Sequence, residues 1–185
     1  EAISKVLYPA DDHIEGKRLR LKQQYFFVSA SLQTIIESHL KQNPSLDNLP
    51  DKAVIHINDT HPALCVPELM RILLDDCGYD WDRAWSIVCR TLAYTNHTVM
   101  SEALEKWDLD LFRQHLPRIT SIIEEIDRRF CKETFEKFPE MRSKISDMAV
   151  IGNNQVRMAN LCLIACFSVN GVSRLHSEIL KNDLF

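Results

Sequence analysis

The chain has 185 residues, of which 45% are hydrophobic and 26% are charged, a composition typical of one globular domain with a sizeable core. With 22 Lys+Arg against 26 Asp+Glu, the formal net charge is -4, which argues against nucleic acid or an anionic membrane surface as a partner. No apolar run reaches the roughly 20 residues of a membrane span, and no signal peptide is recognisable, so we expect a cytoplasmic protein.

The first half of the chain predicts a long helix and a buried strand, followed by two more helices. Residues 17–41 carry apolar side chains at steps of three and four, which is typical of an amphipathic helix. After a segment rich in turn formers, the β-branched run at 53–57 predicts a buried strand that ends in a polar loop. The two further helices expected here cover 67–76, stopped by Gly78, and 81–96, capped by Asp80 and Asn96.

The second half predicts helices and one apolar segment that periodicity does not resolve. A short helix is expected over 101–107, and isoleucines at helical spacing predict an amphipathic helix from Ile119 to Phe130. The apolar run at 158–169 suits a buried strand, although its periodicity leaves a helix open. The elements expected after this run are a tight turn at 170–171 and a helix over 173–180.

Helices dominate this pattern, and the expected fold class is a helix-rich α/β domain. The strands are few and buried, so they cannot close a sheet by themselves. They suggest a piece of a parallel α/β layer whose other strands are missing. We therefore expect the chain to be a fragment of a larger fold.

Six cysteines lie within apolar stretches, so we expect reduced, buried thiols and not a disulfide framework. Cys162 and Cys166 have one-turn helical spacing, but the nearest histidine, His176, is ten residues further on. A structural zinc site needs four clustered ligands, and we therefore expect no metal site.

The first candidate site is the turn that follows the predicted strand at 53–57. In open α/β sheets, ligands collect at the carboxyl ends of the strands, and this end presents the polar run 58–61. One interpretation is a ligand-facing loop in which Asp59 accepts hydrogen bonds from hydroxyl groups and His61 donates or accepts them. The other is an Asx-turn leading into Pro62, with His61 packed in the turn.

A second candidate is the run Thr95-Asn96-His97-Thr98, which follows a predicted helix. A histidine flanked by hydroxyl and amide side chains suits a polyhydroxylated ligand. A single histidine beside a helix end is also a common capping residue, because its charge complements the helix dipole.

A third candidate is the acidic loop that contains Asp11, Asp12 and Glu15 beside His13. Paired carboxylates can act as acid and base on glycosides, or they can bind a divalent cation together with a histidine. Adjacent residues of one loop rarely converge on one atom, so a solvated loop before the first helix is the alternative.

Two further groups have mainly structural interpretations. Trp81 and Trp85 share a helical face, and this spacing favours a place in the core over a sugar-stacking platform. A basic set opens the long helix, where cations oppose the dipole, so it suits either phosphate contact or pairing with carboxylates. The members of this set are Lys17, Arg18, Arg20 and Lys22.

Several segments of the chain occur in the same order in one known family. They include Glu-Gly-Lys-Arg-Leu-Arg-Leu-Lys at 15–22, Asn-Asp-Thr-His-Pro-Ala-Leu at 58–64, Ala-Tyr-Thr-Asn-His-Thr-Val at 93–99 and Val-Asn-Gly-Val at 169–172. Together they resemble the glycogen (α-glucan, maltodextrin) phosphorylase family. The likeness covers the whole chain with compatible spacing, and it corresponds to the later part of that family's N-terminal domain.

The resemblance implies a fold and an activity. Residues 1–185 would be a fragment of the Rossmann-like N-terminal domain of a two-domain, GT-B type glycosyltransferase. The complete enzyme would be a cytoplasmic homodimer that uses inorganic phosphate to release glucose 1-phosphate from α-1,4-glucan. Its cofactor would be pyridoxal 5′-phosphate, held by a lysine outside this chain, so the fragment alone would be inactive. The alternatives are a fragment of a nucleotide-sugar glycosyltransferase and a stand-alone helical interaction module.

The resemblance also implies residue roles. His97 matches a histidine that meets the glucosyl 6-hydroxyl and whose backbone carbonyl lies near the anomeric carbon. Asp59 and His61 match polar residues that line the pocket beside that carbon. Asp11 and Asp12 fall in a segment that resembles the active-site gate loop, where Asp12 replaces a familiar asparagine, so its direct contact with sugar is in question. Members activated by AMP carry two arginines where this chain has Glu37-Ser38, so we expect no AMP activation.

Overall fold

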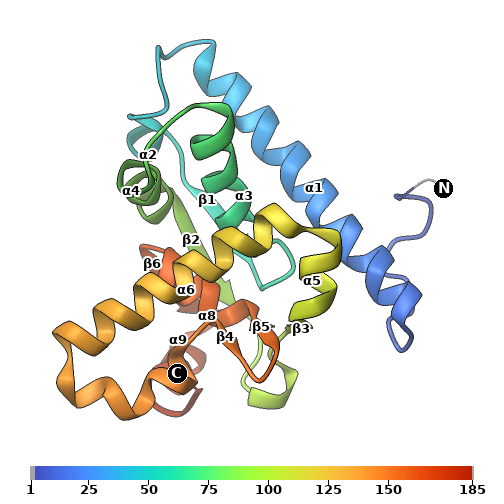
Figure 1. Cartoon of the computed structure of the whole chain (residues 1–185), viewed down its shortest axis with the longest axis vertical. Helices are drawn as coiled ribbons and strands as arrows, with labels where there is room; N and C mark the ends of the chain where they lie inside the picture. The colour runs from blue at the N-terminus through green and yellow to red at the C-terminus, as the bar shows by residue number, and fades with distance from the viewer. Residues whose placement is uncertain (1–2, 185) are drawn as a thin grey trace.

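The structure is a computed structural model that describes residues 3–184. At its centre is a three-stranded parallel sheet with the strand order β1-β2-β6. Parallel neighbours need long crossover connections, and helices supply them between each pair of strands (Figure 1). The strands of this sheet are β1 (Ile55–Asn58), β2 (Leu92–Asn96) and β6 (Ser168–Gly171).

A second, antiparallel sheet with the order β3-β5-β4 lies within the connection from β2 to β6. Its central position holds Val156, which pairs with Trp107 on one side and with Ile151 on the other. Val156 is buried, so this small sheet contributes to the same core as the parallel one. Its strands are β3 (Lys106–Asp108), β4 (Ile151–Gly152) and β5 (Gln155–Arg157).

Helices make up most of the fold. The longest, α1 (Ile14–Leu40), runs along one side of the molecule and packs beside α3, while α6 crosses in front of the sheet in the view of Figure 1. The other helices are α2 (Leu49–Lys52), α3 (Cys65–Arg71), α4 (Trp81–Thr91), α5 (Leu109–His115), α6 (Pro117–Lys137), α7 (Ile145–Met148), α8 (Met158–Ala165) and α9 (Arg174–Ile179). Short 3-10 and π-helical segments are η1 (Ile72–Asp76), η2 (Ser101–Ala103), η3 (Pro139–Lys144) and η4 (Leu180–Leu184).

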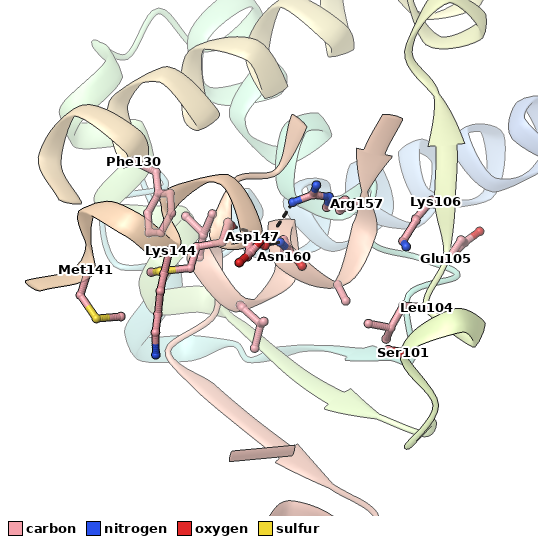
Figure 2. A pocket seen from close by; sticks show the side chains of 14 residues that line it. Ser101, Leu104, Glu105, Lys106, Phe130, Met141, Lys144, Asp147, Arg157 and Asn160 are labelled. Carbon is pink, nitrogen blue, oxygen red and sulfur yellow. Dashed lines mark hydrogen bonds between the residues drawn. The ribbon is translucent and has the colours of Figure 1, made fainter. Parts of the chain in front are cut away.

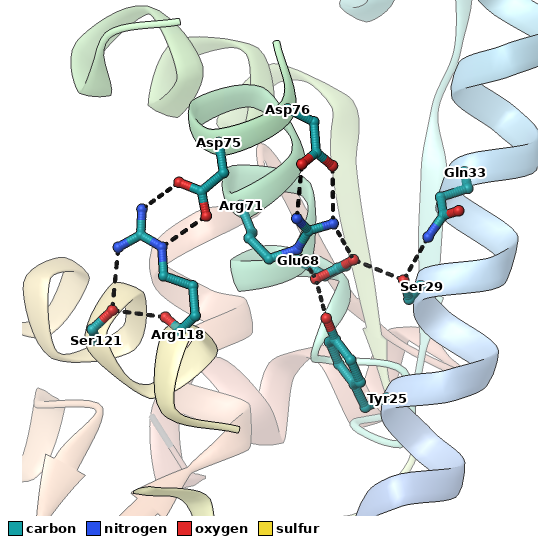
Figure 3. A network of polar contacts seen from close by, with 9 residues as sticks. All are labelled: Tyr25, Ser29, Gln33, Glu68, Arg71, Asp75, Asp76, Arg118 and Ser121. Carbon is teal, nitrogen blue, oxygen red and sulfur yellow. Dashed lines mark hydrogen bonds and ion pairs between the residues drawn. The ribbon is translucent and has the colours of Figure 1, made fainter. Parts of the chain in front are cut away.

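A buried carboxylate anchors α1 to α3. Glu68 of α3 is 0% exposed, and its oxygens accept hydrogen bonds from Tyr25 and Ser29 of α1 at 2.9 and 2.8 Å (Figure 3). Arg71 donates to the same carboxylate through Nε and Nη2, and it also pairs with Asp76. Every oxygen of Glu68 therefore has a donor, as a buried charge requires.

The strand β1 shows how the parallel sheet presents two different faces. Ile57 is fully buried against the helices, whereas His56 and Asn58 on either side of it are exposed. Because side chains alternate along a strand, one face of the sheet packs into the core and the other carries polar groups.

Several predicted elements are confirmed. The helix expected over 17–41 is α1, the strand expected over 53–57 is β1 shifted by one or two residues, and the helix around Ile119 is α6. The helix expected over 173–180 is α9, and Ser173 is its N-cap. Trp81 and Trp85 pack against the core. The mixed, helix-rich α/β class is confirmed as well.

Three predictions are wrong. The helix expected over 81–96 ends at Thr91, and its last five residues form β2. All of β2 is buried, so it lacks the alternation that marks a half-exposed strand. Trp107 lies in β3 and not in the helix expected over 101–107. The run at 158–169 is mostly the helix α8, so the buried strand expected there is wrong and the alternative of a helix is correct.

The six cysteines are free, as expected. Cys65 and Cys162 are buried, but Cys77 is exposed, which corrects the expectation for that residue. Burial raises the pKa of the Cys89 and Cys166 thiols to about 12, so both are protonated and unreactive near neutral pH. Within residues 3–184, no helix has the length and apolar character to cross a membrane.

Candidate functional site

The candidate site lies at the carboxyl edge of the parallel sheet. Asn58 ends β1 and His97 directly follows β2, and the His97 Nε2 atom lies 2.6 Å from Asn58 Oδ1. An amide oxygen accepts only, so His97 donates from Nε2, and its Nδ1 is left as an acceptor. His97 is exposed, which leaves this acceptor open to a ligand hydroxyl. Since His97 follows a strand and not a helix, the alternative interpretation of His97 as a helix-capping residue is wrong.

A second hydrogen-bonded chain crosses all three strands on the same polar face. His56 Nε2 lies 2.6 Å from the Thr95 hydroxyl, which donates to Asn170 Oδ1 at 3.1 Å. These contacts join β1, β2 and β6 just below the carboxyl edge. The sequence pattern did not identify His56 or Asn170 as site residues, because their partners are on other strands.

Asp59 begins the turn after β1 with φ of +59°, in the left-handed region that residues other than glycine rarely occupy. Its backbone N–H donates to the Thr95 carbonyl at 2.9 Å, and its Oδ1 accepts from the Thr60 N–H at 2.7 Å. The carboxylate thus stabilises its own turn, as the Asx-type interpretation expects. The same residue also lines a pocket, so the two interpretations of this turn are compatible.

That pocket is a cavity of about 240 Å³ between the turn after β1 and the loop after β2. Its lining combines two acids, a guanidinium and an imidazole with two apolar groups. It therefore offers both donors and acceptors to a small, hydroxyl-rich ligand. The lining residues are Arg20, Asp59, Thr60, His61, Thr98, Ala103, Leu104 and Glu105.

Glu105 holds this pocket together from the loop before β3. One of its oxygens accepts from Thr60 Oγ1 at 2.7 Å, and the other accepts from Gln24 and Trp107, both at 3.0 Å. The carboxylate therefore ties the turn after β1 to α1 and β3. No sequence pattern identifies Glu105 as a site residue, since Thr60 lies 45 positions away along the chain.

The N-terminal segment lies beside His61. The Tyr8 and His61 rings meet edge to face with centroids 6.4 Å apart, and Arg20 lies 6.0 Å from the Tyr8 ring. Asp11 pairs with Arg20 at 2.9 Å, whereas Asp12 is exposed. The segment around the two acids is therefore linked to the pocket through Arg20, and the acids do not converge on one atom.

Neighbouring residues of this segment have structural roles. His13 caps α1, because its Nδ1 accepts from the Gly16 N–H at 3.0 Å. Glu15 pairs with Arg18 at 2.7 Å, so carboxylate pairing accounts for Arg18 as it does for Arg20. Among residues 3–184, no group of three or more His, Cys, Asp or Glu side chains is placed to hold a metal ion.

A larger cleft, of about 890 Å³, lies between η2–β3 and the helices α7 and α8 (Figure 2). Its two lysines, Lys106 and Lys144, stand on different sides of the cleft. Arg157 and Asn160, which point into it, already donate to backbone carbonyls that include those of Asp147 and Ala149. With its best donors engaged, this cleft is a weaker candidate than the sheet edge.

The described residues do not fit pyridoxal phosphate as a resident cofactor. An imine with its aldehyde requires a lysine, and every lysine between residues 3 and 184 is exposed at the surface. None of these lysines lines the pocket beside Asp59. Among residues 3–184, the pocket beside Asp59 therefore offers polar groups but no lysine that could anchor that cofactor.

Sequence comparisons add an independent line of information. The sequence profile of the carbohydrate phosphorylase family matches residues 1–185. Glycogen phosphorylase of Bacillus subtilis (strain 168) is 55% identical over 181 residues, which are 98% of this chain and 23% of that protein. Alpha-glucan phosphorylase 2, cytosolic, of Arabidopsis thaliana is 48% identical over 194 residues, covering 100% of this chain and 23% of the relative. The muscle form of human glycogen phosphorylase is 47% identical over 196 residues, with the same coverage of 100% and 23%.

Proposed function

Because the chain belongs to the carbohydrate phosphorylase family and spans only 23% of the length of these relatives, we propose that it is the sugar-facing segment of an α-glucan phosphorylase. The reaction is the release of glucose 1-phosphate from glycogen or maltodextrin by inorganic phosphate. The observation that supports this most directly is the hydrogen bond between His97 and Asn58 at the carboxyl edge of the sheet, next to the turn in which Asp59 lines a pocket.

In this proposal, His97 binds a glucosyl hydroxyl. Asn58 orients its ring by accepting from Nε2, which leaves Nδ1 to accept from the 6-hydroxyl. The backbone carbonyl of His97 lies near the anomeric carbon, where its dipole favours the positive charge that develops in the transition state. A preorganised dipole of this kind acts without reorganisation during the reaction.

Asp59 and His61 form the polar wall beside the anomeric position, and Glu105 fixes that wall through Thr60. Asp11 and Asp12 belong to a gate segment over the site, attached through Arg20. Asp12 accepts hydrogen bonds only, so it contacts a donating group of the sugar or none.

The remaining parts of the proposal concern the complete protein. Residues 1–185 form the later part of a Rossmann-like N-terminal domain in a GT-B type homodimer. Pyridoxal 5′-phosphate is held by residues outside this chain, and the segment alone has no activity. The name of the Arabidopsis relative gives a cytosolic location, which we carry over. Glu37 and Ser38 are exposed on α1 and offer no cation to AMP, so AMP does not activate the enzyme.

The test uses the complete product of the gene. Its mass and its absorbance spectrum are measured first, followed by phosphate-dependent release of glucose 1-phosphate from maltodextrin. We expect a much longer chain that carries pyridoxal phosphate and has this activity. Glucosyl transfer from a nucleotide sugar without phosphorolysis would favour a glycosyltransferase instead. A product of this length that binds neither cofactor nor glucan would favour an interaction module.

A further inference from the structure

His176 connects the two turns that follow β2 and β6. It lies in α9 and is 6% exposed. Its Nδ1 accepts a hydrogen bond from the Val172 N–H at 3.2 Å, and its Nε2 lies 3.0 Å from the backbone oxygen of Thr98, 78 residues away along the chain. Because an N–H only donates and a carbonyl only accepts, the neutral ring with its hydrogen on Nε2 satisfies both contacts.

The residues around His176 fix the place of the ring. Ser173 accepts from the His176 N–H at 3.1 Å, and Ser177 Oγ accepts from the Gly171 N–H at 3.0 Å. A Cβ added to Gly171 would lie 2.8 Å from His176 Cγ, so the ring packs onto the end of β6 only because residue 171 has no side chain. The imidazole is therefore held from both sides of the turn at 172–173.

Thr98 is the point where this contact reaches the candidate site. Its N–H donates to Asn96 Oδ1 at 2.8 Å and its carbonyl accepts from His176, so both of its backbone polar groups are held. Residues 97–100 belong to neither helix nor strand, and no sheet ladder constrains them. These two hydrogen bonds therefore set the path of the backbone that carries His97.

We propose that His176 is a positioning residue of the glucosyl site. By donating to the Thr98 carbonyl, it holds the loop after β2 so that the backbone carbonyl and imidazole of His97 face the sugar together. It acts through Thr98 and does not itself touch the reacting atoms. This inference rests on the proposed function, because a positioning role has meaning only for the site that it positions.

Two substitutions separate the hydrogen bonds of the ring. The amide of His176→Asn reaches only as far as Nδ1, so it keeps an acceptor for Val172 and loses the donor to Thr98. The amide of His176→Gln extends to the region of Nε2 and keeps that donor. In the complete protein, we expect His176→Asn to lower kcat about tenfold with the KM for phosphate unchanged, and His176→Gln to recover most of that loss.

The matched control is Arg174→Ala. Arg174 is exposed on the same helix, and within the described part of the chain its ion pair is with Glu178, so its removal leaves kcat unchanged. Melting temperatures are recorded for all three variants. A kcat that is lower for Asn than for Gln at similar melting temperatures supports the inference. Equal kcat values for the two variants, or losses that only follow the melting temperature, overturn it.

A second measurement applies even if His176→Asn does not fold. Nitrogen NMR of the unsubstituted protein shows which ring atom of His176 carries the hydrogen. A hydrogen on Nε2 supports the inference, and a hydrogen on Nδ1 overturns it. An unsubstituted protein without phosphorolysis contradicts the proposed function itself, whereas equal kcat values in an active protein contradict only the role of His176.

Discussion

Two polar regions of the molecule contain similar groups but differ in burial and in how many of their hydrogen bonds are made. Around Glu68, a carboxylate that is 0% exposed receives donors from Tyr25, Ser29 and Arg71, and no capacity is left over (Figure 3). At the carboxyl edge of the sheet, Asn58 and His97 bind each other but remain exposed and retain unused acceptors. A saturated buried network stabilises the fold, whereas an unsaturated exposed one is available to a ligand.

Burial also affects the titration of two tyrosines in the scaffold. Burial, and then the Glu68 carboxylate beside it, raise the pKa of Tyr25, so its hydroxyl keeps the proton that it donates. Burial also raises the pKa of Tyr94, whose hydroxyl accepts from Asn96 in the centre of the sheet. Both tyrosines are therefore fixed parts of the scaffold near neutral pH.

The largest effect is expected from Arg71→Ala, which leaves the buried Glu68 carboxylate with too few hydrogen-bond donors. Glu68 then keeps Tyr25 and Ser29 but loses its cation while fully buried. Breaking a buried pair by removing one partner is strongly destabilising, and we expect a loss of about 3 kcal/mol in the free energy of unfolding. Urea denaturation of the complete protein measures it. A change well under about 1 kcal/mol would show that the network is not what joins α1 to α3.

His97→Ala tests the exposed polar region at the carboxyl edge of the sheet. Removing a group that meets the sugar, in a site of preorganised dipoles, is expected to lower kcat about 100-fold. The side chain is exposed, so the free energy of unfolding and the absorbance of bound pyridoxal phosphate stay as they were. Undiminished turnover with maltodextrin would refute the assignment of His97.

Asn58→Ala probes the orientation of His97. It removes the oxygen that accepts from His97 Nε2 at 2.6 Å, and we expect kcat to fall about tenfold, the size of one lost hydrogen bond. Asn58→Asp is the matched control, because its carboxylate still accepts from Nε2 and preserves more activity. If alanine and aspartate had the same effect, Asn58 would not act as the acceptor.

The smallest effect is expected from Arg118→Ala, which breaks an exposed pair close to the Glu68 network (Figure 3). Arg118 and Asp75 are 51% and 34% exposed, so the free energy of unfolding changes by less than about 1 kcal/mol. Hydrogen bonds from Arg118 hold the pKa of Asp75 below its ordinary 3.8. The pair therefore contributes at neutral pH, and its contribution is lost as the pH falls through the folded-state pKa. NMR titration is expected to show this pKa returning to its ordinary range in the variant.

The sequence predicts elements well where one face is buried and the other solvated. The helix α1 was predicted on this basis, whereas the strand β1 was predicted as a buried strand from its β-branched run. The strand β2 was not, because Leu92 continues the apolar face of α4 and the five residues of the strand are all buried. Burial on both faces removes the alternation that separates a strand from the end of a helix.

The candidate site was predictable to the extent that it is local. Asp59 and His61 follow a recognisable strand, so their turn was found from the pattern. His97 was favoured as a site residue only because of the family resemblance. The family match confirms that resemblance. Glu105 and His176 were missed because their partners, Thr60 and Thr98, lie 45 and 78 positions away in sequence. Contacts at such separation leave no periodic signal in a single sequence.

The left-handed backbone of Asp59 has a consequence for engineering. A non-glycine residue in this region costs on the order of 1 kcal/mol, and glycine at the same place would relieve it. Replacing Asp59 by glycine would relieve that cost, but it would also remove the hydrogen bond that Oδ1 accepts from the Thr60 N–H, a loss of about 1 kcal/mol, together with the carboxylate that lines the pocket. The two changes nearly cancel, so a screen that selects for heat resistance alone would tolerate the loss of this acid and would not detect the damage to the site.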